Sequence, residues 1–476
     1  MTNFFKIFKQ KAVLSLLLLA LVLRLFYLTT PLADWHSFRQ ADTASVTREY
    51  LKHSIDLLRP KYHDLSNIQS GKDNLEGYRM VEFPFINALT ALLLRTFTFL
   101  PLVPTSRVIS LIFSLGTVAT IFYLVKSITS FKQAYLTSLL MAIMPYSVFY
   151  SRAVLPEAPM LFFSTFSIFS FYQYLYHHKK SVFWFALSLV SLALALLLKP
   201  FVAFLAPVYL FLWLKKDKFR FYLRWPVVVL VVSSFLPLML WRQWIGHFPT
   251  GIPASDWLFN GNGIRLRPAW FRWLFYHRFT QLITGYGSLI MPLAFLSKWK
   301  TDTLLIISWW LSILAYLVVI ATGNVQHDYY QVLTLPVLFM TLAKALVFVW
   351  DYLEKHFTYS SAALAIGCLI LFFWFNSYQQ VKGYFNINHW EYIKVGKIVD
   401  QTLPIDAKVI APAMGDTVFL FQTNRTGWPI GFEIEDKISK GAEYYVSTSM
   451  DDETKMLMSK YQVLEKTDEY AIIKLR

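Results

Sequence analysis

Apolar residues gather in long runs along this chain, and most polar residues fall between the runs. The stretches 12–27, 109–125 and 361–375 contain no acidic residue and almost no basic one. Each can cross, or nearly cross, a hydrocarbon core of roughly 30 Å, where the backbone must satisfy its own polar groups. Because the runs are too long for barrel strands and show no alternation, the pattern predicts transmembrane helices.

The polar segments divide the apolar sequence into about eleven predicted spans. A further apolar segment, 83–103, is interrupted by Arg95, Pro101 and Pro104, and we interpret it as an interfacial helix. If that segment instead crossed the membrane, every later segment would change side. The predicted spans are 12–29, 107–125, 133–150, 159–176, 181–198, 201–214, 225–241, 281–297, 303–321, 331–349 and 360–376.

The formal net charge is +16, and the basic residues lie in short runs between spans, at 177–180, 215–220 and 298–300. All of these fall on one side of the predicted topology, which is the positive-inside pattern and not a nucleic-acid-binding face. The N-terminus is therefore expected in the cytoplasm. A cleaved signal peptide is the alternative, but Pro31 disrupts the small-residue cleavage pattern.

The last hundred residues, 377–476, differ from the rest. Short strands are predicted at 409–411, 417–421, 444–446 and 470–475, and a helix at 390–402. We therefore predict an all-α polytopic membrane domain, 1–376, with outer loops 30–83 and 242–280, followed by a small extracytoplasmic α/β domain. Cys368 is the only cysteine, which excludes an internal disulfide and cysteine-rich zinc sites.

Three acids return to the outer membrane surface in this topology: Asp42, Glu82 and Glu157. Acids beside a bilayer are costly to desolvate, so they are candidates for function. Structural roles are the alternatives. Asp42 could cap a helix with Thr43, Glu82 could end its loop, and Glu157 could pair with Arg152.

Lys199, followed by Pro200, ends an apolar run on the same side. Such a lysine can snorkel to the interface or hold a phosphate there. The patch Gln326–Tyr330 begins a later span and could be part of an aromatic belt, and His327 would need a partner to act as a ligand or base. The chain has no GxxxxGK[ST], GxSxG or HExxH motif, so ATP-driven pumping and the corresponding hydrolases are not indicated.

Taken in order, these motifs resemble the lipid-dependent glycosyltransferases of the GT-C fold. They are most similar to the bacterial group of protein O-mannosyltransferases and the aminoarabinose transferase of lipid A, glycosyltransferase family 39. The resemblance covers roughly residues 10–350. It depends on Phe38–Ala44, Glu82-Phe83-Pro84, Glu157, Lys199-Pro200 and the His-x-Tyr-Tyr stretch 327–330.

The resemblance implies an inverting enzyme that moves a sugar from a polyprenyl-phosphate donor to an acceptor hydroxyl at the outer face. Asp42 would be the general base, with Asp34 as a rival because the family's acidic pair is Ala41-Asp42 here. Glu82 and Glu157 would complete the catalytic set. The donor phosphate would contact Lys199, Arg152 and Arg107, and the substrates would contact Arg39, His327, Tyr329 and Tyr330. Glu82, Glu157 and His327 would position the substrates, or hold a divalent cation, Mg²⁺ or Mn²⁺, if the enzyme uses one.

The expected partners are a polyprenyl-phosphate sugar, a lipid, glycan or protein acceptor, and the membrane, with no nucleic acid. The expected location is the bacterial inner membrane, with the C-terminal domain extracytoplasmic. A transporter or flippase of a lipid-linked substrate is the alternative, and it would require broken helices with charges near the middle of the bilayer. A scaffold protein that binds through 377–476 is a second alternative.

Overall fold

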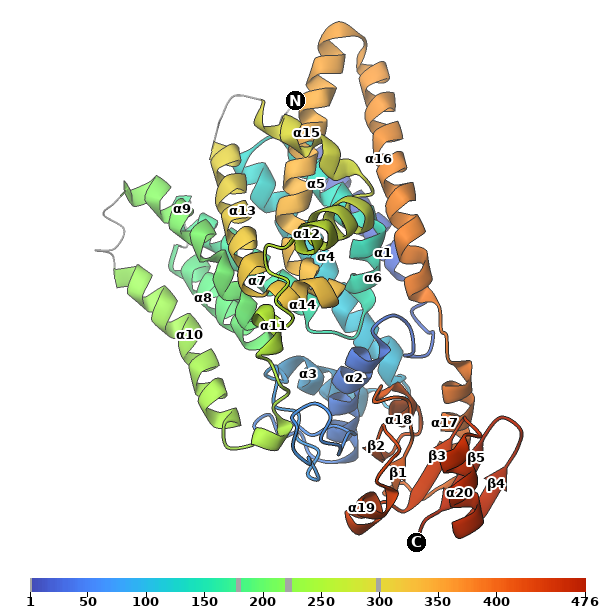
Figure 1. Cartoon of the computed structure of the whole chain (residues 1–476). Helices are drawn as coiled ribbons and strands as arrows, with labels where there is room; N and C mark the ends of the chain where they lie inside the picture. The colour runs from blue at the N-terminus through green and yellow to red at the C-terminus, as the bar shows by residue number, and fades with distance from the viewer. Residues whose placement is uncertain (1, 177–180, 219–224, 297–300) are drawn as a thin grey trace. The chain divides into compact units, whose positions relative to one another are not determined.

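The computed structural model describes residues 2–176, 181–218, 225–296 and 301–476 (Figure 1). It contains two compact units. The helical unit comprises Met1–Leu28, Val108–Trp241 and Ser255–Gly383, and the α/β unit comprises Thr29–Arg107, Arg242–Ala254 and Tyr384–Arg476. The predicted basic clusters at 177–180 and 298–300, and the end of the one at 215–220, lie outside the described residues.

The helical unit contains most of the long apolar helices, as its composition requires. Its described elements, of which α4 and α10 extend slightly beyond its bounds, are α1 (Thr2–Arg24), α4 (Leu102–Ile128), α5 (Phe131–Ile143), α6 (Pro145–Arg152), α7 (Glu157–Tyr176), α8 (Ser181–Leu198), η1 (Pro200–Leu205), α9 (Ala206–Asp217), α10 (Trp225–Ile245), α11 (Trp257–Asn260), α12 (Pro268–Phe271), the π-helix η4 (Arg272–Ile283), η5 (Gly287–Phe295), α13 (Thr301–Val319), α14 (Ala321–Gln326), η6 (Asp328–Thr334), α15 (Leu335–His356) and α16 (Tyr359–Val381).

Within the described residues, five helical stretches are long and apolar enough to cross a membrane, or six if α5 and α6 form one bent span. The predicted count of eleven is therefore not confirmed. Some predicted spans are broken or short. The one at 201–214 consists of the 3₁₀ segment η1 and the 12-residue α9. The predicted interfacial segment contains α3 (Phe85–Thr96), which at 12 residues is shorter than the roughly 20 needed to span a bilayer.

The third predicted span is interrupted where α5 meets α6, with a bend of 61°. Pro145 disfavours helical geometry at Met144, which is extended (φ −62°, ψ 129°). The break leaves carbonyls at the end of α5 without helical partners. The buried guanidinium of Arg24 donates to two of them, Met141 O at 3.1 Å and Ala142 O at 2.7 Å. Arg24 on α1 therefore stabilises the bend.

The α/β unit contains a five-stranded sheet of order β2-β1-β3-β5-β4. Strands β2, β1 and β3 are parallel, and β3, β5 and β4 are antiparallel. Its elements are α2 (Ser37–Lys52), α3, η3 (Pro249–Gly251), α17 (Trp390–Thr402), β1 (Lys408–Ile410), α18 (Val418–Gln422), β2 (Thr426–Trp428), α19 (Ile434–Ser439), β3 (Tyr444–Ser447), α20 (Asp452–Lys460), β4 (Gln462–Lys466) and β5 (Ala471–Lys474), with η7 (Lys382–Phe385) at its start.

The segment predicted as the first outer loop folds together with the C-terminal segment. Leu65 belongs to the same buried apolar cluster as Trp428. Its amide donates to Gly427 O at 2.8 Å, and the Gly427 amide donates to His63 O at 2.9 Å. Gly427 has φ +154°, and a Cβ there would lie 1.7 Å from Val409 O, so only glycine permits this approach. The structure thus divides the chain differently from the expected boundary at 376.

The prediction of a strand at 417–421 is wrong, because this run forms the helix α18. An apolar run of four residues cannot be assigned to strand or helix by periodicity alone. Asp416 favours the helix, since its Oδ1 accepts from the Val418 amide at 2.8 Å. The predicted helix at 390–402 is confirmed as α17. Strands β1, β3 and β5 lie where strands were expected, whereas β2 and β4 were not predicted.

Candidate active site

Asp42 lies on α2 in the α/β unit, with 1% of its surface exposed. Its Oδ2 accepts from Gln69 Nε2 at 2.9 Å and forms an ion pair with Arg79 at 3.1 Å. Its Oδ1 accepts from Thr417 Oγ1 at 2.8 Å. Two hydrogen bonds and an ion pair, from the loop after α2 and from Thr417, therefore hold this carboxylate in a fixed orientation. We call Asp42, Gln69, Arg79 and Thr417, with the neighbouring Asp64, the Asp42 cluster.

Asp64 is fully buried and was not singled out from the sequence. Burial raises the pKa of its carboxyl to about 6, and the negative charge of Asp42 adds to the increase, while hydrogen bonds from Ser66 and the charge of Arg79 oppose it. Asp64 Oδ1 accepts from the Ser66 amide at 2.8 Å. The nearby negative charge of Asp42 thus adds to the effect of burial in making the Asp64 carboxyl harder to ionise.

Glu82 forms an ion pair with Arg39, and both side chains line a small pocket of about 20 Å³. Arg79 and Thr43 also line it, so Arg79 connects this pocket to the Asp42 carboxylate. The Glu82 side chain is 15% exposed, which makes it more accessible than Asp42. The structure therefore brings Glu82, Arg39 and Asp42 to neighbouring positions in the α/β unit. The remaining residues that line the pocket are Val46, Pro60, Pro84 and Asn87.

Arg107, predicted to bind phosphate, is also in the α/β unit and is fully buried. It donates to Thr30 O at 2.5 Å and pairs with Asp34 at 3.4 Å. Gln40 donates to the other oxygen of Asp34 at 2.7 Å. These contacts fix the start of the segment that leads into α2. They also engage both carboxylate oxygens of Asp34, the alternative candidate for the general base.

Glu157 and Lys199 form the central ion pair of the helical unit. Pro200 disfavours helical geometry at Lys199, which is extended at the end of α8 (φ −149°, ψ 114°). Its Nζ lies 3.2 Å from Glu157 Oε1, at the start of α7, and both side chains are buried. The other oxygen of Glu157 is buried and has no hydrogen-bond partner among the described residues. From the sequence, Arg152 was a candidate structural partner for Glu157, whereas the structure gives Glu157 Lys199 as its partner. Arg152 lies on α6 and donates to Tyr27 O at 3.2 Å.

The predicted aromatic residues lie beside Lys199. Its Nζ is 5.7 Å from the ring centroid of Tyr330 and 6.0 Å from that of Tyr329. The His327 ring stacks on Tyr329 at 5.2 Å and meets the edge of Trp257. We call Glu157, Lys199, His327, Tyr329 and Tyr330 the Lys199 cluster.

Sequence reasoning missed a second ion pair in the helical unit. Asp328 is buried, lies 3.6 Å from Arg278, and accepts from Tyr150 Oη at 2.5 Å. Asp328 was visible as the acid within the patch at 326–330. Arg278 could not be found from the sequence, because no local pattern predicts the π-helix η4 on which it lies. π-Helices are rare, and they often occur at functional sites.

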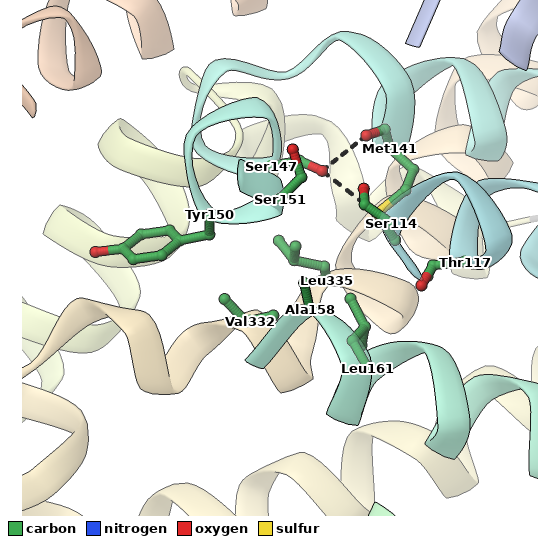
Figure 2. A pocket seen from close by; sticks show the side chains of 10 residues that line it. All are labelled: Ser114, Thr117, Met141, Ser147, Tyr150, Ser151, Ala158, Leu161, Val332 and Leu335. Carbon is green, nitrogen blue, oxygen red and sulfur yellow. Dashed lines mark hydrogen bonds between the residues drawn. The ribbon is translucent and has the colours of Figure 1, made fainter. Parts of the chain in front are cut away.

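Tyr150 also lines a small cavity of about 20 Å³ among the helices, with hydroxyl and apolar side chains in its wall (Figure 2). Ser147 and Ser151 lie above it and Thr117 beside it, and Ser147 Oγ donates to Met141 O at 2.7 Å. The volume is enough for about one water molecule. The cavity is therefore too small for a sugar.

Among the described residues, no group of three or more His, Cys, Asp or Glu side chains is placed to hold a metal ion. Of the three expected ligands, Glu82 belongs to the α/β unit, whereas Glu157 and His327 belong to the helical unit. Glu157 is paired with Lys199, which favours a bound cation less than a free carboxylate would. The residues therefore do not form a ready-made cation site.

Residues 84–241 match the family described as dolichyl-phosphate-mannose-protein mannosyltransferase. No curated protein matches the sequence. The fold is similar to that of ArnT from Cupriavidus metallidurans bound to undecaprenyl phosphate, with a TM-score of 0.69, 12% identity and 97% of each chain covered.

Two other solved structures have the same fold. Archaeal oligosaccharyltransferase AglB from Archaeoglobus fulgidus, in complex with an inhibitory peptide and a dolichol-phosphate, is 12% identical with a TM-score of 0.61, over 94% of this chain and 70% of that one. Arabinofuranosyltransferase AftD from Mycobacteria is 14% identical with a TM-score of 0.52, over 93% and 37%. The chain therefore has the GT-C fold of these membrane glycosyltransferase structures, and residues 84–241 resemble the mannosyltransferase family.

Proposed function

We propose that this protein transfers a sugar from a polyprenyl-phosphate donor to an acceptor hydroxyl at the outer face of the membrane, with inversion at the anomeric carbon. We assign the donor to the helical unit and activation of the acceptor to the α/β unit. Two similar structures contain the corresponding lipid phosphates, undecaprenyl phosphate in ArnT and dolichol-phosphate in AglB. The proposed location is the bacterial inner membrane, with a cytoplasmic N-terminus and an extracytoplasmic α/β unit.

The observation that carries the donor assignment is a buried cation next in sequence to an apolar groove. Lys199 immediately precedes η1, and the η1 residues Val202 and Ala203 line a groove of about 200 Å³. A polyprenyl phosphate has the matching chemistry, an anionic head on a long apolar tail. The other residues of the groove are Leu192, Ala206, Tyr209, Leu210, Trp213, Val227, Leu230, Val231 and Phe235.

Lys199 would stabilise the negative charge that develops on the departing phosphate, and Arg152 of the same unit is the further cation proposed for this role. Arg107, expected from the resemblance to share it, belongs to the α/β unit and pairs with Asp34 there. In the ligand-free chain, Glu157 neutralises Lys199 at 3.2 Å. A phosphate would compete with Glu157 for the same ammonium group. Tyr329 and Tyr330 would contact the donor head, since their rings lie about 6 Å from Lys199 Nζ, and His327 would join them through its stacking on Tyr329.

Asp42 would act as the general base. The acceptor oxygen attacks the anomeric carbon, the bond from that carbon to the phosphate oxygen breaks with its electron pair, and the acceptor proton goes to the Asp42 carboxylate. Of the three partners of Asp42, the neutral amide of Gln69 is the one that an acceptor hydroxyl would replace at least cost. Arg39 and Glu82 would position the acceptor in the adjoining pocket.

The proposal uses no divalent cation in any step, because the described residues form no ready-made site for one. Mg²⁺ or Mn²⁺ remains an expectation from the family resemblance. Transfer measured before and after dialysis against EDTA tests it.

The experiment is an assay of the purified protein in lipid vesicles with a panel of radiolabelled undecaprenyl-phosphate sugars, followed by identification of the labelled product. Asp42→Asn should reduce transfer by roughly 10²- to 10⁴-fold, the range that a general base contributes. The matched variant is Asp34→Asn. In the unaltered protein, Arg107 and Gln40 hold the Asp34 carboxylate. If Asp42→Asn transfers at a near-normal rate, the assignment is wrong, and loss of transfer in Asp34→Asn alone would move the base there.

A further inference from the structure

The segment that begins at Asp416 reaches from the C-terminal sheet to α2. Asp416 Oδ2 accepts from Ser37 Oγ at 3.1 Å, at the start of α2. Arg48, on the same helix, lies 3.7 Å above the Phe421 ring and donates to the Phe421 carbonyl at 2.8 Å. Lys52, at the end of α2, donates to Asn424 O at 2.8 Å. The two helices are therefore bonded at both ends and in the middle.

Thr417 lies within this contact and is buried. Its Oγ1 is 2.8 Å from Asp42 Oδ1 and 3.2 Å from Phe38 O. A hydroxyl has one proton to donate, and the shorter distance and the negative charge both favour Asp42 as its acceptor. Thr417 is thus the only donor to Asp42 Oδ1 among the described contacts, while Gln69 and Arg79 share Oδ2.

We propose that Thr417 is a positioning residue of the transfer reaction, and that the C-terminal sheet serves the active site by orienting the Asp42 carboxylate through it. This inference rests on the proposed function, since it requires Asp42 to be the base. It assigns a role to a domain whose sequence offered none. It also differs from the scaffold alternative, because the contribution of 377–476 is to the chemical step.

Without the Thr417 hydroxyl, Oδ1 loses its donor and the carboxylate can rotate about the Cβ–Cγ bond. A base displaced by about 1 Å can cost roughly 10²-fold in rate. We expect Thr417→Val to lower kcat by roughly 10- to 100-fold while KM for the donor stays within about twofold, because the valine leaves the Lys199 cluster untouched. Thr417→Ser restores a hydroxyl at the same position and should recover most of kcat.

The chain offers a matched control at the other end of α18. Thr423 is also buried, and its hydroxyl donates to Leu420 O at 2.7 Å, with no hydrogen bond to Asp42 among the described residues. Thr423→Val removes a hydroxyl of the same kind and should leave kcat within about twofold. Melting temperatures of both valine variants report any general loss of stability.

The assay uses full-length protein in vesicles and whichever undecaprenyl-phosphate sugar of the panel the unaltered protein consumes. Loss of kcat in Thr417→Val with recovery in Thr417→Ser supports the proposal. Equal losses in Thr417→Val and Thr423→Val, no recovery with serine, or unchanged kcat in Thr417→Val would overturn it. Asp42→Asn, measured in parallel, distinguishes a failure of the Asp42 assignment from a failure of the role proposed for Thr417. If that variant is active, the assignment of Asp42 as the base fails, and this inference with it. If it is inactive while Thr417→Val is normal, only this inference fails.

The contact itself has a test that needs no substrate. Thr417→Val, Asp42→Ala and the double variant form a cycle of melting temperatures. If Thr417 bonds Asp42, the valine substitution lowers the melting temperature less in the Asp42→Ala background than in the unaltered protein. Additive shifts would contradict the contact and overturn the proposal.

Discussion

The two units of this protein hold their buried charges in opposite ways. In the α/β unit, Asp42 accepts hydrogen bonds from Gln69 and Thr417 and forms an ion pair with Arg79. In the helical unit, Glu157 has Lys199 as its partner on one oxygen, and its other oxygen has no hydrogen-bond partner within the described part of the chain. A carboxylate with many donors is fixed in place, whereas a single ion pair can exchange one anion for another. The difference suits a base that must be oriented and a cation that must accept a phosphate.

The largest predicted effect is the loss of transfer rate when Lys199 is replaced. Removing one charged group that stabilises a developing anion costs about 10²- to 10³-fold in rate. We therefore expect Lys199→Met to lower kcat/KM for the donor by about that factor. The control is Lys344→Met, a buried lysine of the same unit that donates to Thr303 Oγ1 at 2.7 Å. Similar losses in both variants would mean that the effect is on folding and would break the comparison.

The second prediction concerns Asp64 and the pH dependence of stability. A carboxyl with a pKa of about 6 in the folded state and about 4 in the unfolded state binds its proton more tightly when folded. The stability from this group is fully present below pH 4 and is lost as pH rises through 6, by up to about 3 kcal/mol. Asp64→Asn, which resembles the protonated acid, should remove that dependence. Melting temperatures of both proteins between pH 4.5 and 7.5 measure it, and parallel curves would contradict the assignment.

The smallest expected effect is a gain. Glu157→Gln removes the carboxylate that competes with the donor phosphate for Lys199, so undecaprenyl phosphate should bind about tenfold more tightly, which is about 1.4 kcal/mol. The variant should also be less stable, because Lys199 keeps its burial without its ion-pair partner. Asp328→Asn breaks the other ion pair of the helical unit and should not tighten binding. Equal or weaker binding in Glu157→Gln would mean that the pair is purely structural.

Local sequence patterns predicted the elements whose signals are local. The apolar run at 181–198 and the helix at 390–402 coincide with α8 and α17. The run at 133–150 was predicted as one span because hydropathy averages over Pro145, and the structure breaks there. The run at 417–421 was too short to distinguish a helix from a strand. Local patterns thus succeed for long elements and fail at breaks and short runs.

The candidate residues were accessible from the sequence, but their partners were not. Asp42 and Lys199 were identified by chemistry and order along the chain. The hydrogen bond from Thr417 to Asp42 joins residues 375 positions apart, and no periodicity predicts such a contact. The pair of Arg278 and Asp328 depends on a π-helix, which has no simple sequence signal. The pairing of Glu157 with Lys199 instead of Arg152 was likewise decided by the break at Pro200.

The central claim is that donor binding belongs to the Lys199 cluster and proton transfer to the Asp42 cluster. Its most direct test is the Kd of undecaprenyl phosphate, measured on the unaltered protein, Lys199→Met and Asp42→Asn under the same conditions. We predict that Asp42→Asn binds like the unaltered protein and that Lys199→Met binds at least tenfold more weakly. Normal binding by Lys199→Met, or equal weakening in both variants, would contradict the account.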